Sequence, residues 1–112
     1  MAALDRLLLW APVVVWAGVI FLFSSIPDLG TDLGIWDLIG RKLAHALEFA
    51  LLGALLLRAV GRPAVAVALG SVYALTDEVH QAFVAGRVGS PLDWAIDTVG
   101  VVLGVLVLAR RR

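Results

Sequence analysis

Four long apolar stretches, separated by short polar or glycine- and proline-rich turns, dominate the hydrophobic pattern of this chain. The first covers residues 7–26, and at 1.5 Å per residue a helix of this length spans about 30 Å, the hydrocarbon thickness of a bilayer. It is too long for the core of a cleaved signal peptide, and no A-x-A-like site follows it. We therefore predict an uncleaved helix here, with further helices at about residues 43–60, 63–84 and 92–109.

These stretches predict an all-α protein, an integral membrane four-helix bundle that forms a single domain over residues 1–112. Composition agrees, since 62% of residues are hydrophobic and the mean hydropathy is +0.99. The absence of cysteine excludes disulfides and thiolate chemistry. Residues 27–42, with several glycines and a proline, are predicted to be a loop. The dense basic run at residues 110–112 directly follows an apolar stretch, which is typical of a membrane flank, and no nucleic-acid partner is expected.

The basic residues indicate how the helices are oriented, because cytoplasmic flanks carry an excess of Lys and Arg. If the N-terminus is cytoplasmic, six basic residues flank the inner ends of the helices: Arg6, Arg58, Arg62, Arg110, Arg111 and Arg112. Three flank the outer ends: Arg41, Lys42 and Arg87. We therefore predict a multi-pass protein of the inner or plasma membrane with both termini cytoplasmic.

Ionisable and polar residues interrupt three of the apolar stretches, and such residues mark functional sites in membrane helices. They lie early in the second stretch, late in the third and early in the fourth: His45, Glu48, Asp77, Glu78, Gln81, Asp93 and Asp97. In the predicted topology all of them lie about 5–12 Å below the outer surface. They also share one face on each helix. The pattern predicts a polar pocket open to the outside and covered by the loop that carries Arg87.

Four motifs extend over these positions: R-K-L-A-H-A-L-E-F at 41–49, D-E-V-H-Q-A-F at 77–83, G-R-V-G-S-P-L-D at 86–93 and D-T-V-G at 97–100. Together they resemble the VanZ-like family of small bacterial membrane proteins, over about half of the chain. The matching positions are Lys42, His45, Asp77, Glu78, Gln81, Arg87, Asp93 and Asp97.

Two positions depart from the family pattern. The family often has Tyr at the position of Phe49 and Asn at the position of Asp97, so this chain lacks a phenol and carries an additional carboxylate. The resemblance implies a link to glycopeptide (teicoplanin) resistance, for which the family offers no settled biochemical mechanism.

The polar residues fit an enzyme or binder of a lipid-linked or phosphate-bearing component of the cell envelope. Five carboxylates lie so close together that not all are expected to be ionised, so a protonated and an ionised carboxyl could form an acid/base pair. His45, Glu48, Asp77 and Glu78 are the candidate acid/base residues. The candidate binding residues are Arg41, Lys42, Gln81, Arg87, Asp93 and Asp97.

Other interpretations stay open from the sequence. The polar residues could be interhelical glue in a non-catalytic scaffold. They could also serve a lipid or peptidoglycan-precursor binder or carrier, although no polar path to the cytoplasm is visible. The spacing His45-x-x-Glu48, repeated by Asp77 and His80, suits a metal, but ion pairing already explains the acids, so no metal or cofactor is expected. The lipid bilayer is one expected partner. The small residues Gly100 and Gly104 also leave open a homodimer in which they form the contact between the two copies.

Overall fold

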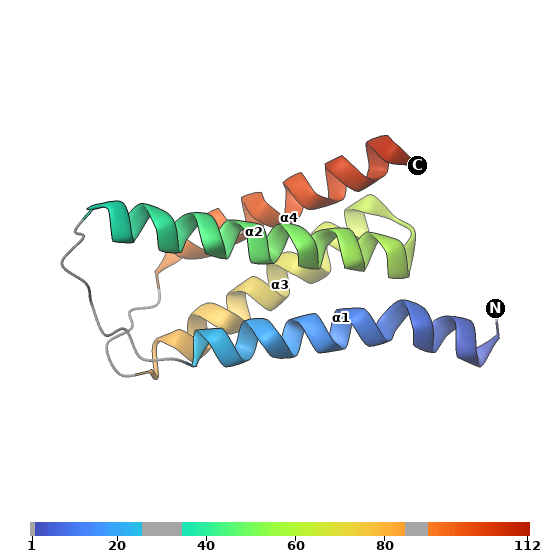
Figure 1. Cartoon of the computed structure of the whole chain (residues 1–112), viewed down its shortest axis with the longest axis horizontal. Coiled ribbons are helices and arrows are strands. Elements are labelled where there is room, and N and C mark those ends of the chain that lie inside the picture. The colour runs from blue at the N-terminus through green and yellow to red at the C-terminus, as the bar shows by residue number, and fades with distance from the viewer. Residues whose placement is uncertain (1, 26–34, 85–89) are drawn as a thin grey trace.

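The computed structural model describes residues 2–25, 35–84 and 90–112, and these residues form helices without strands. The helices are α1 (Ala3–Ser24), α2 (Ile35–Val60), α3 (Pro63–Gln81) and α4 (Pro91–Arg111). The chain runs back and forth along the long axis, and its two ends lie at the same end of the molecule (Figure 1). The predicted all-α architecture is confirmed. That the termini are cytoplasmic stays a prediction.

The loop predicted at residues 27–42 is wrong for residues 35–42, which form the first two turns of α2. Two local features stabilise these turns. Asp37 lies in the first turn, where a negative charge complements the helix dipole. Its carboxylate also pairs with Arg41 one turn later, at 2.9 Å. Gly40 misled the prediction, because a glycine inside a helix costs only about 1 kcal/mol and does not by itself end it. The predicted third helix is likewise shorter, since α3 ends at Gln81 rather than at 84.

A two-residue turn joins α2 to α3. Gly61 adopts a left-handed conformation with φ of +73°, and its N–H donates to the carbonyl of Leu57 at 2.8 Å. This is how helices commonly end, because glycine enters the left-handed region without a Cβ clash. Pro63 then occupies the first turn of α3, where the N–H that it lacks has no intrahelical partner. The turn therefore reverses the chain and sets α3 antiparallel to α2.

The main packing of the fold is the close contact between α2 and α4. A Cβ added to Gly100 would overlap the backbone carbonyl of Ala46, and one added to Gly104 would overlap that of Ala50. The two helices therefore approach each other at backbone distance, as the small-xxx-small spacing permits. These glycines contact α2 of their own chain, which is a different use from the intermolecular contact considered for a homodimer.

The distribution of side chains is that of a membrane protein. Leu47 and Trp36 are 71% and 74% exposed, whereas Asp77 and Asp97 are 3% and 1% exposed. Three of the described helices, α1, α2 and α4, are long and apolar enough to cross a bilayer. The more polar α3 still carries an exposed apolar stripe along its length: Val65, Leu69, Val72, Leu75 and Val79. Apolar exteriors around a polar interior indicate a multi-pass protein that faces lipid.

Candidate polar site at the end of the bundle

The start of α2, the end of α3 and the start of α4 lie at the end of the bundle opposite the two chain termini (Figure 1), and each of these segments carries polar residues. The early part of α2 supplies Lys42, His45 and Glu48, the last turns of α3 supply Asp77, Glu78 and Gln81, and the first turns of α4 supply Asp93 and Asp97. We call these eight residues the polar cluster. Four of them are at most 6% exposed: Asp77, Glu78, Gln81 and Asp97. The sequence predicted that these residues lie at the same level along their helices, and in the structure they do lie at the same end of the bundle.

The imidazole of His45 lies at the centre of the polar cluster. Its Nδ1 is 3.9 Å from Oδ1 of Asp97 on α4 and 3.9 Å from Oε2 of Glu48 on its own helix. Asp77 on α3 completes the group, because ligand atoms of His45, Asp77 and Asp97 all lie within 4.8 Å of one another. One imidazole and carboxylates from three helices therefore lie close together.

Hydrogen bonds hold two of the acidic side chains in place. Gln81 donates from Nε2 to Oδ2 of Asp77 at 3.4 Å, one turn away on α3. The backbone N–H of Ser90 donates to Oε2 of Glu78 at 3.1 Å. The hydroxyl of Ser90 also accepts from the backbone N–H of Asp93 at 3.0 Å, so Ser90 is the N-cap of α4. Ser90 thus joins the start of α4 to the end of α3.

The basic residues of the site are distributed unevenly. Lys42 on α2 pairs with Asp93 on α4, and Arg41 pairs with Asp37 within α2. Arg87 lies outside the described residues. The carboxylates of Asp77, Glu78 and Asp93 act electrostatically on Asp97. Among the described residues, the polar cluster therefore holds five acidic side chains beside Lys42 and His45, and the binding role expected for Arg41, Lys42 and Arg87 stays a prediction.

Removing the lysine of the Lys42–Asp93 pair is expected to cost more stability than removing the aspartate. Lys42→Gln leaves Asp93 facing the other carboxylates, whereas Asp93→Asn removes one of the like charges. We expect Lys42→Gln to lower the free energy of unfolding by about 1 kcal/mol, as for a partly exposed pair, and Asp93→Asn by less. Thermal unfolding of both variants and the double variant in detergent gives the coupling. If both single variants lost the same free energy of unfolding, the neighbouring carboxylates would have no effect on the stability of this pair.

His80 does not join the polar cluster. Its ring stacks on Phe21 of α1 with the ring centroids 4.2 Å apart. Its Nδ1 lies 3.2 Å from the hydroxyl of Ser24, and its Nε2 lies 3.3 Å from that of Ser25. The spacing of Asp77 and His80 therefore does not place both side chains at one site, because His80 faces α1 whereas Asp77 faces α2 and α4.

Two hydrogen bonds between α1 and the other helices were not predicted from the sequence. The indole N–H of Trp16 donates to the backbone carbonyl of Glu48 at 2.8 Å, directly behind the polar cluster. The hydroxyl of Tyr73 on α3 donates to the backbone carbonyl of Ala17. Both acceptors are main-chain atoms, which the identity of a residue does not reveal, so no sequence signal marked these contacts. They attach α1 to the bundle near the level of the site.

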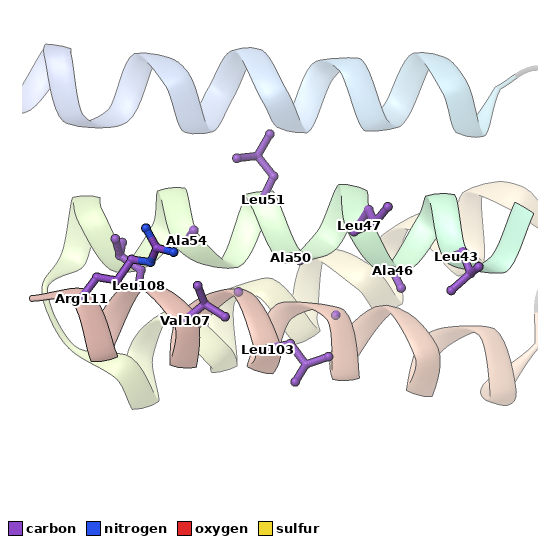
Figure 2. A pocket seen from close by; sticks show the side chains of 12 residues that line it. Leu43, Ala46, Leu47, Ala50, Leu51, Ala54, Leu103, Val107, Leu108 and Arg111 are labelled. Atoms are coloured by element: carbon purple, nitrogen blue, oxygen red, sulfur yellow. The ribbon is translucent and has the colours of Figure 1, made fainter. Parts of the chain in front are cut away.

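An apolar groove of about 650 Å³ runs along the seam between α2 and α4. Figure 2 shows its lining side chains, with Leu43 at one end and Arg111 at the other. Small side chains on α2, Ala46, Ala50 and Ala54, leave room at its floor. Leu43 directly follows Lys42, whose ion pair with Asp93 joins the same two helices. The groove therefore lies between the same two helices that the Lys42–Asp93 pair joins.

The fold and the site define a class: a small multi-pass membrane protein whose helices enclose acidic and imidazole groups at one end. A comparison at the level of families matches residues 9–111 to the VanZ/LLP1 family. The chain belongs to this family, as its motifs suggested. No curated protein and no solved structure matches the chain.

Proposed function

We propose that this protein binds a lipid-linked, phosphate-bearing component of the cell envelope from the outer face of the inner or plasma membrane. The acyl chain of the ligand lies in the groove between α2 and α4, and its phosphate lies at the Lys42 end. The observation that carries the proposal is an apolar groove between α2 and α4, the two helices that the Lys42–Asp93 pair also joins.

The chemistry of the groove favours a lipid tail. It is lined almost entirely by aliphatic side chains, as an acyl chain requires, and its volume of about 650 Å³ is within the ordinary range for ligand sites. Contact with the membrane surface lets a lipid enter sideways without leaving the bilayer. Lys42 is accessible at the outer end, because its side chain is 34% exposed, and an ammonium is a common partner for phosphate.

The polar cluster could act on the bound head group. Glu78 and His45 remain the candidate acid and base, since a positioned carboxyl or imidazole can transfer a proton to a leaving or attacking oxygen. Their surroundings support this role, because Glu78 and Asp97 share a buried site with other carboxylates. Family membership supports teicoplanin as the antibiotic to use in cellular tests.

A scaffold without chemistry is the second candidate. It is favoured by the contacts that polar side chains make between helices, such as the Lys42–Asp93 pair and the hydrogen bond between Ser90 and Glu78. In this interpretation the polar groups only hold α2, α3 and α4 together, each with a contribution of about 0.6–2 kcal/mol. Neutralising single acids would then destabilise the bundle.

Filling the groove tests the lipid proposal. Ala50→Leu places extra methyl groups in the middle of the groove, which should displace part of an acyl chain. Because each buried methylene contributes about 0.8 kcal/mol, losing two weakens binding by roughly tenfold. The measurement is native mass spectrometry of the purified protein titrated with a polyprenyl phosphate, which reports the lipid bound per chain.

The controls separate the tail from the head group. Ala68→Leu makes the same change at an exposed position of α3 outside the groove and should leave binding as in the wild type. The corresponding polyprenol, which lacks phosphate, should bind more weakly than the phosphate. Equal binding by Ala50→Leu and Ala68→Leu would refute the groove as the lipid site. Equal binding of alcohol and phosphate would refute recognition of the phosphate.

A further inference from the structure

The centre of the polar cluster has the composition of a metal site. His45, Asp77 and Asp97 come from three different helices, and one ligand atom from each lies within 4.8 Å of the others. An imidazole nitrogen with two carboxylate oxygens is a donor set typical of Zn²⁺ and Mn²⁺ sites in proteins. Asp77 and Asp97 are also almost fully buried, which distinguishes the group from acids gathered on a solvated surface.

Asp97 provides an independent indication of a missing cation. The residue is 1% exposed, and within residues 2–25, 35–84 and 90–112 its Oδ2 has no hydrogen-bond partner. Burying a carboxylate oxygen without a partner is costly, so such atoms are usually paired or bound to a metal. The imidazole of His45 is 3.9 Å from the other oxygen, Oδ1, which is beyond hydrogen-bonding distance. A divalent ion between these side chains would satisfy Asp97.

We propose that His45, Asp77 and Asp97 bind one divalent transition-metal ion, of the Zn²⁺ or Mn²⁺ class. Ligand atoms around a tetrahedral ion with bonds of about 2.0–2.2 Å lie about 3.4 Å apart, so the three side chains close around the ion by roughly 1 Å. Rotation of their side chains supplies a movement of this size without a shift of the helices. Gln81, which donates a hydrogen bond to Asp77, orients one of the ligands, and the carboxylate of Glu48 lies 3.9 Å from His45.

Three protein ligands leave at least one coordination position open. This is the arrangement of catalytic rather than structural zinc sites, in which water or substrate takes the open position. The metal site does not depend on the lipid proposal, since it is built from side chains of the polar cluster and not from the groove. If both hold, the open position and Lys42 would face the same phosphate.

The experiment measures metal directly in the purified full-length protein. After removal of metal with a chelator and dialysis, the wild type is titrated with Zn²⁺ and Mn²⁺, and bound metal is counted by elemental mass spectrometry. We expect about one ion per chain, and at least a tenfold weaker affinity in His45→Gln and in Asp97→Asn. His80→Gln is the matched control, because His80 faces α1 and lies outside the polar cluster.

A second measurement does not depend on the folding of the ligand variants. The chain has two histidines, so in His80→Gln any imidazole bound to the metal belongs to His45. X-ray absorption at the Zn edge of this variant should show one imidazole and otherwise oxygen ligands. Wild-type protein that retains no ion, or a metal in His80→Gln without imidazole, would overturn the proposal. In either case the lipid titration described above would still stand on its own result.

Discussion

Gly104→Val is expected to disrupt the fold more than any other single change considered. A Cβ at this position would overlap the backbone carbonyl of Ala50 on α2, and a main-chain atom in a helix cannot turn aside as a side chain can. Overpacking of a core costs about 1–3 kcal/mol, and we expect at least the upper value because the helices must separate. The yield of monodisperse protein in detergent and its thermal unfolding temperature report the loss.

Gly18→Val is the matched control on α1. A Cβ added at Gly18 meets no atom within 4 Å, so the same substitution there should leave the unfolding temperature nearly unchanged. Gly100→Val should behave like Gly104→Val, since its Cβ would meet the carbonyl of Ala46. If the variants at 18 and 104 unfold at the same temperature, the close approach of α2 and α4 is not what holds the bundle together.

The number, order and type of helices followed from the hydrophobic pattern, because bilayer thickness sets the length of an apolar helix. The start of α2 did not follow, since Gly40 and the polar residues around it resembled a loop. The ion pair between Asp37 and Arg41 stabilises that segment as a helix, and an i,i+4 pair is easily overlooked in a short polar stretch.

The convergence of the polar residues could also be predicted, because α3 runs antiparallel to α2 and α4, so that the late part of α3 and the early parts of α2 and α4 lie at one end. Their mutual distances could not, since rotation of a helix about its axis depends on packing that the sequence shows only coarsely. His80 illustrates this limit. It lies between Glu78 and Gln81 in the sequence, but its side chain contacts Phe21 on α1.

Charge pairing was the least predictable part of the site. The sequence marked Arg41 as a candidate binding residue but did not show that it pairs with Asp37 one turn earlier on α2. A lysine or arginine side chain reaches several neighbours, so its partner depends on details of packing. The metal proposed for the centre of the polar cluster rests instead on the arrangement of His45, Asp77 and Asp97.

Glu78→Gln is expected to retain the fold and to lose function. The glutamine carbonyl oxygen can still accept the hydrogen bond from the backbone N–H of Ser90. The substitution also removes a negative charge that lies close to Asp77, Asp93 and Asp97. In cells where the wild-type protein protects against teicoplanin, we expect this variant to protect no better than an empty vector, because the candidate acid/base group is gone. Protection equal to the wild type would exclude Glu78 from the chemistry.

The most direct test of whether the polar cluster serves function or stability is thermal unfolding in detergent. It compares Glu78→Gln with the wild type and with Lys42→Gln. We expect Glu78→Gln to unfold at or above the temperature of the wild type, because the substitution relieves like-charge repulsion. We expect Lys42→Gln to unfold at a lower temperature than the wild type. Removing one partner of an ion pair that a buried core needs costs about 3–5 kcal/mol. If Glu78→Gln lost that much free energy of unfolding, the Glu78 carboxylate would be a structural contact between helices and not a functional group.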